Sequence, residues 1–338
     1  MKNTYILGAV ALVVVVVAYA TLTKTEQNTE TLKTADKAEY TIGVIAPLTG
    51  FIADFGVEAK RGIEAATGKE GLKFIFEDDA CDPKLAVTAF KKLTELDKVS
   101  VILGPLCGSS QEAVAPLAKE KGVVLLLPAA ASEALSSTSG GYAFNTQYSL
   151  EFESAFNAKA LYEKGVKSVV VVGFPNAFSE THVKAFTEAY EGTIVASLTF
   201  PADTVPDVEI TKLKGLTFDA LYVPDISFFF SDGMKKLATQ GLNVPVYATY
   251  VAELPIARSF VNGVTYSFPA DMTDGLGGVY GLSKESVELV GPLMNACAGE
   301  AVCVKEALVE TGLFDEFGTR IRPIHLKKVV GEQVVVVQ

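Results

Sequence analysis

The sequence predicts an α/β protein with two similar lobes, each built around a mainly parallel, doubly wound sheet. Short apolar runs alternate with segments of helical periodicity from residue 40 to residue 127. The same alternation restarts near residue 150 after a polar interruption, which indicates a second lobe. Alternation of strand and helix on this scale is typical of sheets that carry helices on both faces. We expect several crossovers of the chain to join the lobes and to act as a hinge.

The first 38 residues are expected to lie outside both lobes. Residues 1–22 combine Lys2 with an apolar run that ends in Ala18-Tyr19-Ala20, a pattern typical of a cleaved export signal. The run is about 18 residues long, near the lower limit for a membrane span, so an uncleaved anchor is the alternative. Residues 23–38 are polar and predict a flexible tether. We therefore expect an exported protein, either periplasmic or held at the outer face of the cytoplasmic membrane.

The first lobe opens with regular alternation and ends in an irregular stretch. The predicted strands are residues 40–46, 71–76, 99–103 and 123–127, and the predicted helices are residues 51–66, 83–96 and 111–121. Val57, Ile63 and Ala66 are expected on the inner face of the first helix, because their spacing is helical. Residues 129–148 are mostly small and polar, so we expect a loop at a ligand cleft and then the passage to the second lobe.

The second lobe repeats this pattern and is followed by a C-terminal block. Helices are predicted over residues 150–164, 178–190, 208–213 and 234–239, and strands over residues 168–172, 194–200, 220–223 and 244–248. The C-terminal block is predicted to hold two helices and a closing hairpin, over residues 283–298, 301–311, 325–330 and 333–337. Gly331-Glu332 lies between the last two strands and suits a hairpin turn.

The composition limits the kinds of partner. The chain has 338 residues, of which 49% are hydrophobic and 20% are charged, enough for two folded domains. Its 29 basic and 40 acidic residues give a net charge of −11, and no basic cluster stands out, which argues against nucleic acid. The only histidines are His182 and His325 and there is no Cys-x-x-Cys, so we expect neither a metal site nor a cofactor. A monomer is expected.

The four cysteines are expected to be structural. An even number of cysteines in an exported chain suggests two disulfides among Cys81, Cys107, Cys297 and Cys303. Three pairings are possible, and the most economical one joins Cys81 to Cys107 and Cys297 to Cys303. The first two cysteines both follow predicted strands, at the sheet edge where open α/β folds bind ligands.

The sequence contains no arrangement typical of catalysis. It lacks a Gly-x-Ser-x-Gly elbow, a Walker loop and a dinucleotide fingerprint. A nucleophilic Cys107 would need a histidine partner, and we interpret His182 as a surface or packing residue instead. The acidic run Glu77-Asp78-Asp79 with Asp82 could bind calcium, but a cap for the following helix is the favoured interpretation. A binding protein is therefore favoured over an enzyme.

Several motifs resemble those of a known family. Residues 40–50, together with Phe55-Gly56 and Arg61-Gly62, resemble the N-terminus of type I periplasmic binding proteins. Asp78-Asp79-Ala80-Cys81-Asp82-Pro83-Lys84 and Gly104-Pro105-Leu106-Cys107-Gly108-Ser109-Ser110 are similar to a signature of the leucine/isoleucine/valine-binding branch. The resemblance covers most of residues 40–338 and weakens after Val264.

The resemblance implies a substrate-binding subunit of an ABC importer. Its two Rossmann-like lobes would close over a ligand, and the closed form would dock on a membrane permease. Lobe one would comprise residues 39–148 plus 251–318, and lobe two residues 149–250 plus 319–338. The family's first cysteine pair is a disulfide, which implies a Cys81–Cys107 bond.

The resemblance also implies ligand-binding positions. Phe55 stands where the family has an aromatic wall, Gly108 where a serine meets the ligand carboxylate, and Ala131 where a threonine anchors the ligand. Phe178 falls at an aromatic position of lobe two, and Tyr250 falls near the acid that pairs with a ligand ammonium. The predicted ligand-binding residues are Phe55, Gly108, Ser109, Ala129, Ala131, Ser132, Phe178, Asp225 and Tyr250.

The departures from the family pattern affect the expected ligand. A buried ammonium needs a carboxylate, which Asp225 could supply unless it is a solvated loop residue. The backbone amides of Gly108 and Ser109, at a helix start, could hold an anion. Tyr250 and Phe228-Phe229-Phe230 favour an apolar or aromatic ligand. We expect an amino acid of branched-chain or aromatic type, or a related amide. The alternatives are a membrane-tethered sensor that presents its ligand to a receptor and, less favoured, an enzyme.

Overall fold

The computed structural model describes most of the chain after the N-terminal segment. The described residues are 39–201, 205, 207–224, 232–253, 261–271, 278–331 and 333–337. The predicted export signal or anchor (residues 1–22), the predicted tether (residues 23–38), Asp225 and Phe228-Phe229-Phe230 lie outside them. Within the described part of the chain, no helix has the length and apolar character that crossing a membrane requires.

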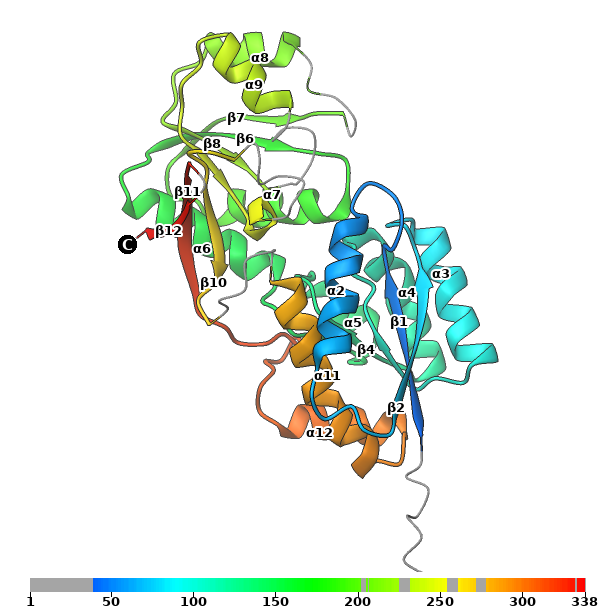
Figure 1. Cartoon of the computed structure of the whole chain (residues 1–338). Coiled ribbons are helices and arrows are strands. Elements are labelled where there is room, and N and C mark those ends of the chain that lie inside the picture. The colour runs from blue at the N-terminus through cyan, green and yellow to red at the C-terminus, as the bar shows by residue number, and fades with distance from the viewer. Residues whose placement is uncertain are drawn as a thin grey trace, which may run out of the picture. The chain divides into compact units, whose positions relative to one another are not determined.

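The first sheet has five strands in the order β2-β1-β3-β4-β5, and all of its pairings are parallel (Figure 1). These strands are β1 (Tyr40–Ala46), β2 (Leu72–Asp78), β3 (Val101–Leu103), β4 (Val124–Leu127) and β5 (Ala143–Asn145). The helices between and around them are α2 (Ala53–Ala65), α3 (Pro83–Lys91), which continues as a π-helix over Lys92–Leu96, α4 (Gly108–Lys121) and α5 (Ala134–Thr138). The central strands β3 and β4 are fully buried, as expected for parallel strands covered on both faces.

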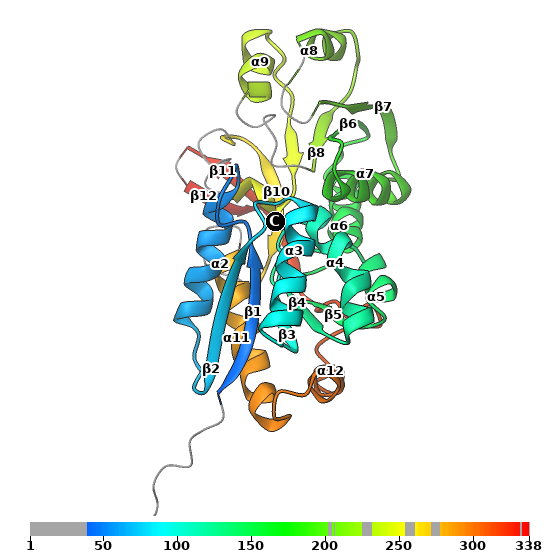
Figure 2. The same cartoon turned by 90° about the vertical axis from the view of Figure 1, so that its right-hand side faces the viewer.

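The second sheet has seven strands in the order β12-β11-β10-β9-β8-β6-β7 (Figure 2). Its parallel strands are β6 (Ser168–Gly173), β7 (Thr193–Thr199), β8 (Ala220–Val223), β9 (Val246–Ala248) and β10 (Thr265–Pro269). The antiparallel strands at one edge are β11 (Ile324–Val330) and β12 (Gln333–Val337), which form the predicted hairpin. The helices of this part are α6 (Leu150–Glu163), α7 (Ala177–Ala189), α8 (Asp207–Lys214) and α9 (Met234–Thr239).

Side-chain caps fix where the helices nearest the strand ends begin. The Asp82 carboxylate accepts hydrogen bonds from the amides of Lys84 (2.7 Å) and Leu85 (3.0 Å), so its predicted capping role is confirmed. Ser149 caps α6 and Asn176 caps α7 in the same way. The helix α4 begins at Gly108, so the helix start expected at Gly108 and Ser109 is confirmed, and the helix is three residues longer than the periodic segment 111–121 indicated. Three further residues of the chain therefore have helical geometry next to the disulfide.

Two expectations for the first lobe are wrong. Residues 129–148 are not a continuous loop, because they contain α5 and the edge strand β5. Val57 does not face inward; it is 45% exposed. The inner face of α2 combines the buried Phe55, Ala59 and Ile63 with two glycines that lie close to other backbone. A Cβ added to Gly56 would lie 2.2 Å from the Pro47 carbonyl oxygen, and one added to Gly62 would lie 2.2 Å from that of Tyr280.

The chain passes between the two sheets in three places. In the described part of the chain these crossovers are residues 146–149 between β5 and α6, residues 270, 271 and 278 between β10 and α11 (Val279–Ala296), and residues 311–323 between α12 (Ala301–Glu310) and β11. The strand β10 belongs to the second sheet, whereas residues 251–318 were assigned to lobe one as a block. The helix α11 packs on α2 beside the first sheet. The second crossover therefore follows Pro269 and not residue 250.

Candidate functional site

A small pocket lies between the first turns of α4 and α7. The space in it that a water-sized group can occupy is about 10 Å³, and the empty space including the solvent at its open mouth is about 200 Å³. The smaller value is about the room for one water molecule, so the pocket marks where the first turns of the two helices face each other, and a ligand fits only after these walls move apart. The residues that line it are Gly108, Gln111, Glu112, Ser132, Leu135, Leu150, Ala177, Phe178 and Thr181.

The first turn of α4 is held in place by a disulfide. Cys107 is the residue before the helix, and it is bonded to Cys81, which follows β2. The second disulfide joins Cys297 to Cys303, so the most economical pairing is the observed one. The loop before the helix is also fixed by the Gln111 amide, which donates a hydrogen bond to the Pro105 carbonyl at 3.2 Å. The start of α4 is thus a rigid wall of the pocket.

The first turn of α4 lies beside the start of α7, with room for a Cβ at position 108. A Cβ added to Gly108 would lie 3.6 Å from the backbone nitrogen of Phe178 and 3.7 Å from its Cβ, which is ordinary van der Waals contact. The amides of the first helical turn have no partner within the helix, and they favour negative charge. The starts of two helices therefore meet at one pocket.

The predicted ligand-binding residues fall into three groups. Gly108, Ser132 and Phe178 line the pocket. The predicted residues that are buried but do not line the pocket are Phe55, Ala129, Ala131 and Tyr250. Ser109 lies in the first turn of α4 and does not line the pocket either. Asp225 lies outside the described residues. The Ser132 hydroxyl is already engaged, because it donates a hydrogen bond to Glu151 Oε1 at 2.6 Å.

Six lining residues were not predicted. They are Gln111, Glu112, Leu135, Leu150, Ala177 and Thr181. Gln111 and Glu112 lie three and four residues after Gly108, and Thr181 lies three residues after Phe178, so helical spacing places each set on one face. This signal was present in the sequence and was not used, because the expected site residues came mainly from the family resemblance.

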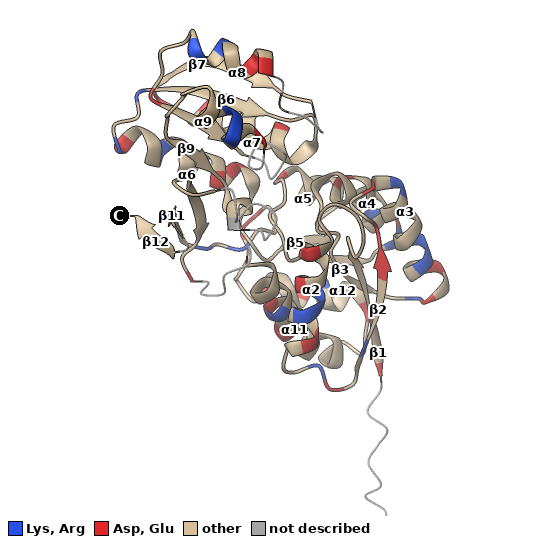
Figure 3. Ribbon diagram, turned by 45° about the horizontal axis from the view of Figure 1, so that its top comes forward, with Lys and Arg blue, Asp and Glu red and all other residues tan. Residues whose placement is uncertain are grey.

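The charged groups around the pocket are carboxylates. Burial raises the pKa of Glu112, and the charge of Glu180 on α7 raises it further. Burial also raises the pKa of Glu133. The Ser149 hydroxyl donates a 2.7 Å hydrogen bond to Glu133 Oε1, and this bond lowers the pKa. None of the nine lining residues is Lys or Arg. In the described part of the chain, Lys and Arg are spread over several other elements, among them α3 and α9 (Figure 3).

A buried polar network lies behind the Phe178 ring. The Phe178 ring centroid is 6.3 Å from that of Tyr250 and 4.5 Å from that of His182. Glu153 on α6 is fully buried, and its Oε1 accepts hydrogen bonds from the Tyr148 hydroxyl (3.2 Å), the Tyr250 amide (3.1 Å) and the Ser267 hydroxyl. Its Oε2 lies 3.6 Å from His182 Nε2. His182 is thus a packing residue, one of the two alternatives that the sequence left open.

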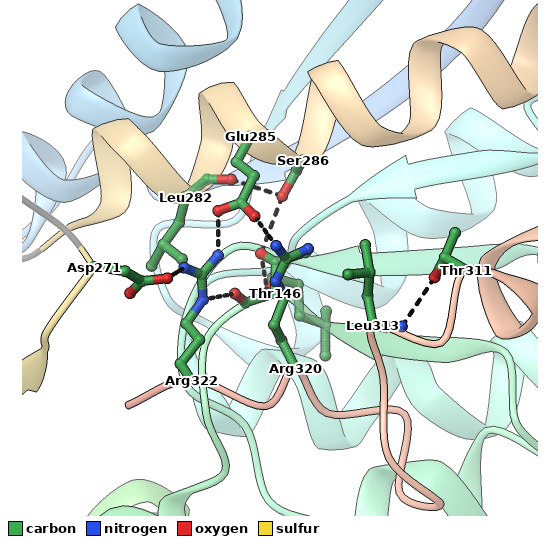
Figure 4. Close-up of polar contacts among 10 residues, drawn as sticks. Thr146, Asp271, Leu282, Glu285, Ser286, Thr311, Leu313, Arg320 and Arg322 are labelled. Atoms are coloured by element: carbon green, nitrogen blue, oxygen red, sulfur yellow. Dashed lines mark hydrogen bonds and ion pairs between the residues drawn. The ribbon is translucent and has the colours of Figure 1, made fainter. Parts of the chain in front are cut away.

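A second buried network ties the three crossovers together around Arg322 (Figure 4). Arg322 belongs to the third crossover and is 4% exposed. Its Nε donates to the carbonyl of Thr146 in the first crossover at 2.8 Å, and its Nη1 donates to Asp271 Oδ2 in the second at 2.5 Å. Its Nη2 pairs with Glu285 on α11, whose other oxygen lies 2.8 Å from Arg320 Nη2. One guanidinium group therefore bonds to every segment that joins the two sheets.

Comparisons with known proteins agree with this architecture. A profile of the periplasmic binding protein family matches residues 39–276, which is more than half of the chain. A Leu/Ile/Val-binding protein homologue of Brucella melitensis is 28% identical over 202 residues, which is 55% of this chain and 54% of that protein. The Leu/Ile/Val-binding protein of Escherichia coli is 31% identical over 110 residues, or 30% of this chain and 29% of that protein. The chain thus spans at most about half the length of these curated relatives.

Two solved structures match most of the chain. The branched-chain amino acid transporter substrate-binding protein LivJ of Streptococcus pneumoniae, in complex with isoleucine, has a TM-score of 0.78 at 19% identity. It covers 88% of this chain and 99% of its own. An ABC transporter solute-binding protein of Rhodopseudomonas palustris, in complex with benzoate, has a TM-score of 0.75 at 18% identity and covers 89% and 96%. At these identities the likeness shows the fold.

Proposed function

The chain belongs to the periplasmic binding protein family (type I, leucine/isoleucine/valine-binding branch), and from this premise we propose that it binds a small amino acid and delivers it to an ABC importer. The family implies an exported protein, and its members are substrate-binding proteins rather than enzymes. Two lobes that close over the ligand, a membrane permease as partner and a monomeric state belong to the same proposal. Cleavage of residues 1–22, with an uncleaved anchor as the alternative, is part of it as well.

The observation that carries the proposal is the pocket between α4 and α7. Its walls combine amides at a helix start with one carboxylate, that of Glu112, and with the apolar surfaces of Leu135, Leu150 and Phe178. The amides favour an anionic group, and the carboxylate favours a cationic one. A zwitterionic α-amino acid with an apolar side chain carries all three features. Its ammonium would pair with Glu112, and Asp225 is the second candidate for this role.

The same pocket disfavours a simple aromatic acid. A benzoate has one negative charge and no cation, so it would place its carboxylate near Glu112 without a Lys or Arg among the lining residues. Two carboxylates in a shared, partly buried site repel each other. The isoleucine-bound neighbour is therefore the better guide to ligand class than the benzoate-bound one.

Isothermal titration of the protein from residue 39 onward tests the ligand class. The probes are L-isoleucine, L-phenylalanine, L-leucinamide and benzoate. We expect binding of the amino acids and no binding of benzoate. Benzoate binding without amino-acid binding would overturn the amino-acid assignment and leave a binding protein. Absence of binding by all four probes would count against the proposed function as a whole.

A matched pair of variants tests the role of Glu112. Glu112→Gln removes the charge that would face the ligand ammonium, and we expect affinity for the amino acid to fall at least about tenfold, corresponding to about 1.4 kcal/mol. Glu120→Gln removes the same charge from the last turn of the same helix, away from the pocket lining, and should leave affinity unchanged. Equal effects of the two substitutions would refute the role of Glu112.

A further inference from the structure

The two oxygens of the Glu153 carboxyl group differ in their hydrogen bonding. Oε1 accepts three hydrogen bonds, from Tyr148, Tyr250 and Ser267. Oε2 is fully buried and has no hydrogen-bond partner of ordinary length; the atom that faces it is His182 Nε2, at 3.6 Å. The carboxyl group therefore points one oxygen at an imidazole nitrogen that also lacks another partner.

The two nitrogens of the His182 imidazole also differ in their hydrogen bonding. Its Nδ1 lies 2.7 Å from the Ser154 hydroxyl, which can donate or accept, while its Nε2 has no hydrogen-bond partner. The side chain is fully buried between α6 and α7. Two unpaired buried polar atoms, one on each residue, are costly unless a proton lies between them.

No cation compensates for the Glu153 carboxyl group in the described part of the chain, where its only ion-pair contact is with His182. The other titratable groups that face it are the hydroxyls of Tyr148, Tyr222 and Tyr250. Their polar neighbours Ser154, Asn157 and Ser267 carry no charge. The pair must therefore satisfy Oε2 and Nε2 by itself.

We propose that Glu153 and His182 keep one proton between Oε2 and Nε2 from pH 5 to pH 9, and that the pair positions Phe178, which lines the pocket, and Tyr250 behind it. Phe178 packs on the His182 ring, and the Tyr250 amide is bonded to Glu153. The two residues thus hold the Phe178 wall of the pocket in place. The shared proton itself does not depend on the proposed function, since it concerns the protein without ligand.

A single shared proton requires the imidazole to change tautomer when Glu153 ionises. When Glu153 is protonated, its Oε2–H donates to Nε2, so the ring proton must reside on Nδ1 and be donated to Ser154. When Glu153 is ionised, Nε2–H donates to Oε2, and Nδ1 accepts from Ser154. The Ser154 hydroxyl can serve both forms because it is donor and acceptor.

The electrostatics of the site agree with this scheme. Burial raises the pKa of Glu153 to about 7, against the hydrogen bonds from Ser267, Tyr250 and Tyr148, which lower it. Burial lowers the pKa of His182 to about 3. Between these two values the acid is protonated and the imidazole is neutral. The change of tautomer is therefore expected near pH 7.

Nitrogen NMR of the protein labelled at histidine tests the proposal without any ligand. The chain contains only His182 and His325, so two imidazole spectra are expected, and a His325→Gln variant assigns them. Couplings from the ring protons tell a protonated from an unprotonated nitrogen. We expect His182 to carry its proton on Nδ1 at pH 5 and on Nε2 at pH 9. The same tautomer at both pH values would overturn the shared proton.

Glu153→Gln should lock the pair in its low-pH form. The new amide nitrogen would donate to Nε2 at every pH, so His182 should remain protonated on Nδ1 from pH 5 to pH 9. The ring signals of Phe178 should shift near pH 7 in the original protein and not in the variant. A variant that switches tautomer as the original protein does would refute the role of Glu153. If the variant does not fold, the titration of the unaltered protein still decides the matter.

Discussion

The two networks, around Arg322 and around Glu153, each surround an ionisable side chain with little access to water, and they compensate its charge in different ways. Around Arg322, a guanidinium that stays charged at all relevant pH values is matched by Asp271 and Glu285. Around Glu153, a carboxyl group is matched by three neutral donors and by a neutral imidazole. The first network ties the three crossovers together, and the second lies behind the ligand pocket.

The difference shows what decides whether a buried acid stays charged. Glu285 has a fixed cation next to it and is partly exposed, with a 26% exposed side chain. Glu153 has no cation and is fully buried, so desolvation raises its pKa. Desolvation disfavours the charged form, and only a nearby opposite charge or several hydrogen bonds can restore it. The pocket network, which is the one around Glu153, is therefore expected to respond to pH in the neutral range.

The largest effect is expected when the pocket network loses its common acceptor. Glu153→Ala leaves the Tyr148 hydroxyl, the Tyr250 amide and the Ser267 hydroxyl without their partner. Each buried unsatisfied donor costs about 1–3 kcal/mol, and the hydroxyls can rotate, so we expect a loss of about 4 kcal/mol in the free energy of unfolding. Urea denaturation measures it. Glu153→Gln keeps an acceptor oxygen and should cost less than about 1 kcal/mol; equal losses would contradict this assignment.

The crossover network should give the next largest effect. Arg322→Met removes the cation that pairs with Asp271 and Glu285, and it breaks the hydrogen bond to Thr146. Breaking a buried ion pair costs about 3–5 kcal/mol, and the carboxylates here can partly hydrate, so about 3 kcal/mol is expected.

Arg320→Met is the matched control for that substitution. Arg320 contacts Glu285 only, with a 20% exposed side chain, and such pairs contribute up to about 1 kcal/mol. Thermal unfolding of both variants compares them. A loss from Arg320→Met as large as that from Arg322→Met would show that Arg322 has no special role.

The pH dependence of the free energy of unfolding should distinguish the contributions of Glu153 and His182. The reference pKa values are 4.5 for Glu and 6.5 for His, against about 7 for Glu153 and about 3 for His182 in the folded protein. Between pH 4.5 and pH 6.5 the unfolded chain binds one proton at His182 and the folded chain binds one at Glu153. The pair therefore contributes no slope in this window.

Single substitutions should reveal slopes of opposite sign. Glu153→Gln leaves only the depressed pKa of His182, so stability should rise with pH up to about 6.5. His182→Asn leaves only the raised pKa of Glu153, so stability should fall as the pH rises from about 4.5 to 7. Each slope is at most about 1.4 kcal/mol per pH unit. Urea titrations from pH 4 to pH 8 measure them, and slopes of the same sign would contradict the pairing.

The smallest effect is expected for Ser267→Ala. The Ser267 hydroxyl is the side-chain donor that most lowers the pKa of Glu153, and it also accepts from Asn157 Nδ2 at 3.0 Å. Its loss should cost about 1 kcal/mol of stability and raise the midpoint of the His182 tautomer change above pH 7. Thr265→Ala, two residues earlier on the same strand, is the control and should not move the midpoint.

The sequence alone determined the architecture. The period of the apolar residues placed most helices and strands, since runs such as Val169–Val172 are buried by composition and need no distant partner to be recognised. It also supported the two disulfides, because an even number of cysteines in an exported chain favours complete pairing. The cap at Asp82 depends on residue types at short spacing. The family resemblance was likewise carried by local motifs, around Cys81 and Cys107.

Only the tertiary structure decided the pocket lining and the two buried networks. Glu153, His182 and Ser267 lie on three elements, and Arg322 meets Thr146 and Asp271 over separations of 176 and 51 residues. No local sequence pattern predicts contacts between residues so far apart in the chain. Val57 was misplaced because periodicity alone did not show which side of α2 packs. The inner face holds the buried Phe55, Ala59 and Ile63 together with Gly56 and Gly62, which closely approach the backbone of Pro47 and Tyr280. Local periodicity predicts where helices and strands form. The burial of a side chain and the charged groups next to it depend on how those helices and strands pack.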